Sequence, residues 1–105
     1  MKLNVGERLT LVSLVPEKGN FETMATVEKL KSVLYLSEEE VTEYAVSLVG
    51  PKTKWNEKGN EGKEVEISQT GMSLITKILK GLDEKEELTG SQYKIFKRIK
   101  DEQKE

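Results

Sequence analysis

The sequence predicts a single α+β domain with a β-hairpin at its centre and two helices at its C-terminal end. In the first and last thirds of the chain, apolar residues recur every three or four positions, which is the period of a helix that packs on a core. The middle third carries short apolar or alternating runs between glycine, asparagine and proline, as strands and turns do. A chain of 105 residues is long enough for one core without disulfides or metals.

The first segment, residues 5–15, is predicted to be a helix. Asn4 and Glu7 have the spacing of a capping box, and Pro16 cannot continue the helix. The stretch is also rich in leucine and valine at alternating positions, so a strand is the alternative. The residues expected to face inward in the helix are Leu9, Val12 and either Leu11 or Val15.

Two further helices follow in the first half of the chain. The second is predicted over residues 21–35, because apolar residues recur there with helical spacing. Ser37 and Glu40 form another capping box and open a short helix that ends near Tyr44. Glutamates in its first turn are favourable near the positive end of the helix dipole. The inward-facing residues of the second helix are Met24, Val27, Leu30 and Leu34.

The centre of the chain predicts a β-hairpin. Residues 45–49 form an apolar run that Gly50 and Pro51 break, and residues 63–67 alternate polar and apolar side chains. We expect these two segments to pair, with the loop at 56–62 as the tip of the hairpin. A small third strand at 52–56 is compatible with the pattern.

The last third predicts two helices joined by an acidic, exposed connection at residues 83–87. Thr89 and Gln92 form a third capping box, and the final residues 101–105 are expected to fray. The first of these helices covers residues 70–82, with Met72, Ile75, Leu82 and either Ile78 or Leu79 on its apolar face. The apolar face of the last helix is predicted to be Tyr93, Phe96 and Ile99.

The composition excludes much of the chemistry of small enzymes. The chain has no histidine and no cysteine, so it has no ordinary transition-metal site and no histidine-activated nucleophile. Carboxylate pairs such as Glu64 and Glu66 lack the predicted burial that separates the pKa values of a catalytic acid and base. We therefore expect no enzymatic activity and no cofactor.

The charge and hydropathy of the chain indicate where in the cell the protein is expected to lie. The net charge is −2, and the longest apolar run is far too short to span a membrane. The first residues carry charge at once and lack the apolar region of a signal peptide. These features predict a cytoplasmic protein without a membrane partner.

The order of the predicted elements resembles a winged-helix domain with a C-terminal helical extension. In a DNA-binding version the third helix would enter the major groove and present basic or amide side chains. Here that helix is acidic, and its carboxylates would repel phosphates. We therefore predict a protein-binding surface of aromatic and acidic character, made of Glu38, Glu39, Glu40, Glu43 and Trp55.

Two alternatives stay open. Basic residues near the single tryptophan and on the last helix are compatible with binding of nucleic acid. The acidic connection and the basic last helix either solubilise the chain or form a face for self-association, such as a homodimer. Whether Trp55 is buried is open as well. The alternative nucleic-acid-binding residues are Lys54, Lys58, Lys94, Lys97 and Arg98.

Several short segments together resemble small accessory proteins of tailed phages and prophages. These segments are Gly6–Leu9, Pro16–Phe21, Leu36–Glu40, Trp55–Asn56 and the helix that begins at Leu88–Thr89. The resemblance implies a protein of the bacterial cytoplasm that acts by binding another protein. Inhibitors of host-defence nucleases, including anti-CRISPR proteins, are one such class. A part in virion assembly is the third possibility.

Overall fold

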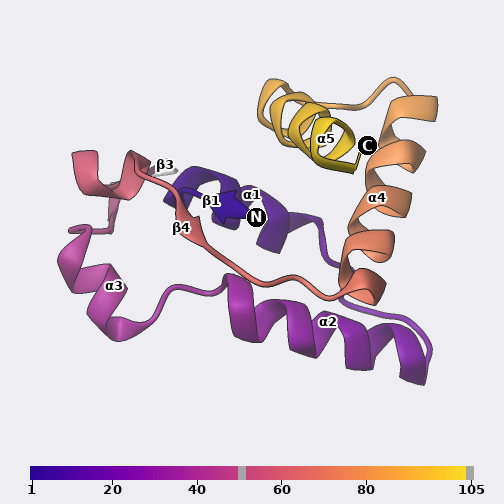
Figure 1. Cartoon of the computed structure of the whole chain (residues 1–105), viewed down its shortest axis with the longest axis horizontal. Coiled ribbons are helices and arrows are strands. Elements are labelled where there is room, and N and C mark those ends of the chain that lie inside the picture. Colours follow the sequence, from indigo (N-terminus) through magenta and orange to yellow (C-terminus); the bar gives the residue numbers. More distant parts are fainter. Residues whose placement is uncertain (50–51, 104–105) are drawn as a thin grey trace.

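The computed structural model describes residues 1–49 and 52–103 and shows an α+β domain (Figure 1). Helix α1 lies at the centre and packs against the three longer helices, so it is the element that organises the fold. The two small sheets are antiparallel pairs, β1 with β4 and β2 with β3. The four long helices are α1 (Val5–Leu14), α2 (Phe21–Leu34), α4 (Gln69–Glu84) and α5 (Gly90–Gln103).

The first segment is a helix, which settles the choice between helix and strand. The backbone N–H of Glu7 donates to Asn4 Oδ1 at 2.8 Å, and the N–H of Asn4 donates to Glu7 Oε1 at 3.0 Å, as the capping box predicts. The helix ends at Leu14, before an extended Val15 and Pro16. Leu11 is the residue of this helix that is completely buried.

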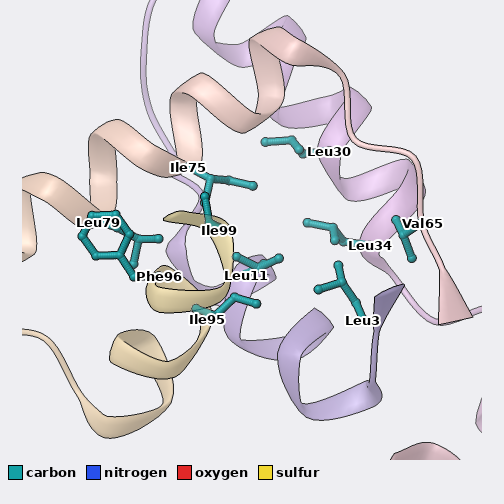
Figure 2. Packing of buried hydrophobic residues seen from close by; sticks show 10 residues of the cluster. All are labelled: Leu3, Leu11, Leu30, Leu34, Val65, Ile75, Leu79, Ile95, Phe96 and Ile99. Carbon is teal, nitrogen blue, oxygen red and sulfur yellow. The ribbon is translucent and has the colours of Figure 1, made fainter. Parts of the chain in front are cut away.

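The hydrophobic core gathers where α1, α2, α4 and α5 meet (Figure 2). The predicted apolar face of α2 is confirmed at Val27, Leu30 and Leu34, which are buried, whereas Met24 is only partly buried. The predicted face of α5 is wrong at one position: Tyr93 is 57% exposed, and Ile95 is buried in its place. The core cluster consists of Leu3, Leu11, Leu30, Leu34, Val65, Ile75, Leu79, Ile95, Phe96 and Ile99.

The strand pairing differs from the prediction. Strand β2 (Ser47–Val49) pairs with β3 (Lys52–Lys54), so the third strand suggested near 52–56 is the true partner of the first. Strand β4 (Lys63–Glu64) pairs with β1 (Lys2–Leu3), a strand that the sequence did not predict. The physical reason is burial, because this pairing holds Leu3 and Val65 in the core. The predicted break at residues 50–51 lies outside the described residues.

Residues 35–64 form an excursion from the core. They contain α3 (Glu38–Glu43), the β2–β3 hairpin and the 3-10 helix η1 (Glu57–Asn60). The excursion leaves from Leu34 and returns at Val65, both of which are core residues. Among the side chains that the structure describes, none between these two belongs to the core cluster or to the apolar residues packed against it.

The structure of the C-terminal part agrees closely with the prediction from the sequence. Thr89 Oγ1 accepts from the N–H of Gln92 at 3.2 Å, and Gln92 Oε1 accepts from the N–H of Thr89 at 3.0 Å, so the third capping box is present. Helix α5 continues to Gln103, past the point where fraying was expected; residues 104–105 lie outside the description. None of the helices in the described ranges is both long and apolar enough to cross a membrane.

Candidate functional site

Helix α3 is held away from the body formed by the four long helices (Figure 1). Its only buried residue is Glu40, so the helix adds no apolar side chain to the core. The predicted surface residues Glu38, Glu39 and Glu43 are exposed, and Val41 and Thr42 are exposed beside them. The helix therefore presents almost its whole circumference to solvent.

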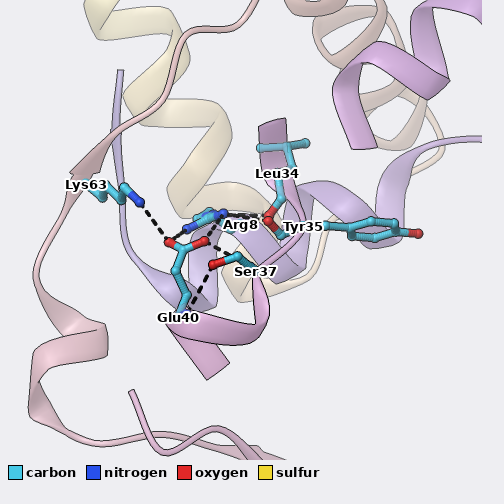
Figure 3. Close-up of polar contacts among 6 residues, drawn as sticks. All are labelled: Arg8, Leu34, Tyr35, Ser37, Glu40 and Lys63. Atoms are coloured by element: carbon cyan, nitrogen blue, oxygen red, sulfur yellow. Dashed lines mark hydrogen bonds and ion pairs between the residues drawn. The ribbon is translucent and has the colours of Figure 1, made fainter. Parts of the chain in front are cut away.

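Glu40 is the exception, and its predicted place on the binding surface is wrong. Glu40 is 7% exposed, and its side chain faces Arg8, which is 4% exposed (Figure 3). Arg8 Nη1 donates to Glu40 Oε2 at 2.6 Å, and Arg8 Nη2 donates to Glu40 Oε1 at 3.3 Å. Because a buried carboxylate requires a partner, this ion pair fixes the inward face of α3.

Arg8 also caps the C-terminal end of α2, the helix that precedes α3. Its Nε donates to the carbonyl oxygen of Leu34 at 3.0 Å, and its Nη2 donates to that of Tyr35 at 2.8 Å. These carbonyls belong to the end of α2, where backbone acceptors have no partner within the helix. One guanidinium thus terminates α2 and positions α3, a geometry that the single ammonium of a lysine does not reproduce.

Arg8 is not among the functional residues predicted from the sequence. Its signal is its place in the helical pattern, because it lies three residues after Val5 and three before Leu11, on the buried face of α1. A charged residue on the apolar face of a helix indicates a buried partner.

The pKa of Glu40 is lowered from its ordinary value of 4.5 to about 2. The hydrogen bond from Arg8 is the main cause and outweighs burial, which raises the pKa. The backbone N–H of Ser37 donates to Glu40 Oε1 at 3.0 Å, and Lys63 Nζ donates to Oε2 at 3.2 Å. These bonds all favour the charged carboxylate.

This shift predicts a loss of stability in acid. A carboxyl group with a pKa of about 2 in the folded chain and 4.5 when accessible adds about 3 kcal/mol to the free energy of unfolding above about pH 5. As the pH falls from about 5 to about 2, the unfolded chain takes up this proton first, so the contribution is lost. Urea unfolding at a series of pH values measures it. The Glu40→Gln variant is the control and should lack this part of the pH dependence; equal slopes in both proteins would contradict the prediction.

Trp55 is half-buried, which answers the question that the sequence left open. Its Nε1 donates to Asn60 Oδ1 at 2.8 Å. The indole lies against Gly6 and Gly59, and a Cβ atom at Gly59 would approach Trp55 Cδ1 to 2.5 Å. Glycine at these positions therefore makes room for the ring.

The loop with Trp55 is attached to the end of α3. The backbone N–H of Asn56 donates to the carbonyl oxygen of Tyr44 at 2.8 Å, and Asn56 Nδ2 donates to that of Glu43 at 2.9 Å. Just after α3, Ala45 has a left-handed conformation with φ of 51°, which turns the chain towards β2. The structure thus joins Trp55 to the same excursion as the acidic side chains.

A groove of about 360 Å³ runs beside Trp55, between the start of α1 and helix α5. Lys94 also lines this groove, so the structure places one residue of the alternative basic set in the same groove as the indole. Arg98 is paired with Glu7 and donates to the carbonyl oxygen of Lys2 at 2.6 Å. Lys54, Lys58 and Lys97 are exposed, on β3, η1 and α5 respectively, and do not line this groove.

In residues 1–49 and 52–103, no three acidic side chains converge closely enough to hold a metal ion. Comparison with models of protein families, with curated proteins and with solved structures finds no match to this chain.

Proposed function

We propose that this chain is a non-enzymatic protein-binding module whose contact surface is the exposed side of α3 together with Trp55. The observation that carries the proposal is the buried Arg8–Glu40 ion pair, which holds in place a helix that buries no apolar side chain. A six-residue helix is not stable alone, since nucleation is costly and few hydrogen bonds follow. The ion pair therefore serves to present this helix.

The geometry of α3 sets the character of the surface. With the helical period, Glu38 and Thr42 lie opposite the buried Glu40. Val41 lies on one flank and Glu39 and Glu43 on the other. The outermost surface is thus acidic with a single apolar side chain at its margin. Such a surface fits a basic region of a partner, and its charge would raise the rate of encounter.

The resemblance to small phage proteins supplies the biological setting of the proposal. In that setting the partner is a protein of a bacterial defence system, and this chain is its inhibitor, as anti-CRISPR proteins are. A defence nuclease carries a basic surface for its nucleic acid. The acidic side of α3 is complementary to a surface of that kind.

Charge reversal tests this assignment. The variant Glu38→Lys, Glu39→Lys, Glu43→Lys should lower the association rate with the partner by about ten- to a thousandfold, because steering becomes repulsion. The tagged protein is used to isolate the partner from a nuclease-treated lysate of a bacterial host, and the rate is measured with that partner. The matched control is Glu17→Lys, Glu22→Lys, Glu28→Lys, which changes the same charge at exposed positions on or before α2. Equal binding by both variants would refute this surface.

A nucleic-acid-binding, winged-helix-like domain is the second candidate, favoured by the groove that Lys94 and Trp55 both line. Base stacking on an indole beside a cation is a recurrent mode of binding single strands. Recovery of a partner that nuclease abolishes, together with affinity that falls steeply with salt, would support this candidate over the first.

A further inference from the structure

We propose that two copies of this chain associate through a surface over α5 and the end of α4, related by a two-fold axis. We call this surface the α4–α5 patch and define it by Asp83, Leu88, Tyr93, Phe96, Lys97 and Lys100, which line a groove of about 290 Å³. The patch lies on the body of four helices, while α3 lies on the excursion (Figure 1). The proposal therefore goes beyond the function assigned to α3.

The centre of the patch is apolar and aromatic. Tyr93 exposes more than half of its side chain, and Leu88 is partly exposed beside the same groove. Phe96 forms the floor, and Lys100 Nζ lies 4.5 Å from the centre of its ring. Part of the apolar face of α5 therefore extends beyond the core and stays exposed. Tyrosine in such a position gains from burial against another protein, since its large ring loses little conformational entropy.

The charges lie on two sides of this centre. On the α4 side, Asp83 lines the groove and is followed in the sequence by the exposed Glu84, Glu86 and Glu87. On the α5 side, Lys97 and Lys100 line the groove. Asp101 also lies on the α5 side, one turn beyond Lys97, and weakens its positive charge locally. We call residues 83–87 the acidic turn. None of the ion pairs among the described residues involves this turn, Lys97 or Lys100.

This arrangement is complementary to itself. In a two-fold dimer, residues on one side of the axis contact residues from the opposite side of the other copy. An axis through Tyr93 would therefore place the acidic turn of each copy against Lys97 and Lys100 of the other. Both contacts are then attractive at once.

The acidic turn has a defined conformation. The backbone N–H of Glu87 donates to the carbonyl oxygen of Leu82 at 2.9 Å, and that of Glu86 donates to Asp83 at 3.0 Å. Glu86 itself is left-handed, with φ of 59°. These bonds form the Schellman end of α4, and the capping box at Thr89 then starts α5. A pre-organised turn reduces the entropy that association costs.

Sedimentation of the full chain over a wide range of concentration tests the proposal. The wild-type chain should pass from 11.9 kDa to twice that mass. Lys97→Glu with Lys100→Glu, and separately Glu84→Lys with Glu87→Lys, should each raise the dissociation constant about a hundredfold or more, because like charges then face each other. An equimolar mixture of the two variants should recover the dimer, since every contact is again attractive.

The mixing experiment distinguishes an interface from a structural defect. A variant that merely misfolds is not rescued by the oppositely charged one, and circular dichroism checks the fold of each. The matched control, Lys18→Glu with Lys29→Glu, changes the same charge at exposed positions elsewhere and should dimerise normally. A wild-type chain that stays monomeric at every concentration, or variants that fail to recover on mixing, would overturn the proposal.

Discussion

Replacement of Arg8 by alanine is expected to lower the free energy of unfolding by about 3 to 5 kcal/mol, the cost of breaking a buried ion pair from one side. The variant leaves Glu40 buried without its guanidinium and leaves the carbonyl oxygens of Leu34 and Tyr35 without their donor. Urea unfolding followed by circular dichroism measures this change.

Two further variants show which property of Arg8 matters. Arg8→Lys keeps the charge but not the planar set of donors, so it should recover only a small part of the lost stability. Arg8→Met combined with Glu40→Leu removes both charges and should be less damaging than Arg8→Ala alone. If Arg8→Lys were as stable as the wild-type chain, the capping of α2 by the guanidinium would not matter.

Replacement of Leu11 by alanine is expected to lower the free energy of unfolding by about 3 to 5 kcal/mol. Leu11 is 0% exposed and lies in the core cluster on the central helix α1 (Figure 2). The other long helices pack on α1, so the cavity cannot close without moving several of them. Chemical denaturation of the variant measures the loss.

Leu9→Ala is the matched control for this prediction. It removes the same atoms from the same helix at a position that is only partly buried. We expect it to cost clearly less than Leu11→Ala, because part of the side chain is already in water. Equal losses would show that α1 is not oriented as described.

The helices were predictable because their signals are local. Asn4, Ser37 and Thr89 each stand three residues before a glutamate or glutamine, and each forms the expected capping box. Tyr93 was misplaced because Ile95 and Phe96 are adjacent in the sequence, and the apolar stripe of α5 therefore admits two rotations about the helix axis.

The sheets and the inner face of α3 were not predictable in the same way. Strand β1 has two residues, too few to show alternation, and its partner lies about sixty positions away. For Glu40 the local pattern gave the capping box correctly, but its burial depends on Arg8, which is 32 positions distant. Local sequence patterns do not show which distant residues come into contact. Glu38, Glu39 and Glu43 lie on the same helix and are exposed to solvent.

The excursion at residues 35–64 separates the positions that contribute to the surface from those that contribute to folding. Its described side chains take no part in the core cluster, and its two ends are fixed at Leu34 and Val65. Most substitutions at the exposed positions of this segment change stability by less than about 0.5 kcal/mol. Under the proposed function, mutations at these positions would act mainly on partner binding, whereas mutations of core residues in the four long helices would act on folding. Exposed positions of the excursion can therefore change with little effect on folding, whereas Arg8, Glu40 and the glycines beside Trp55 are expected to resist substitution.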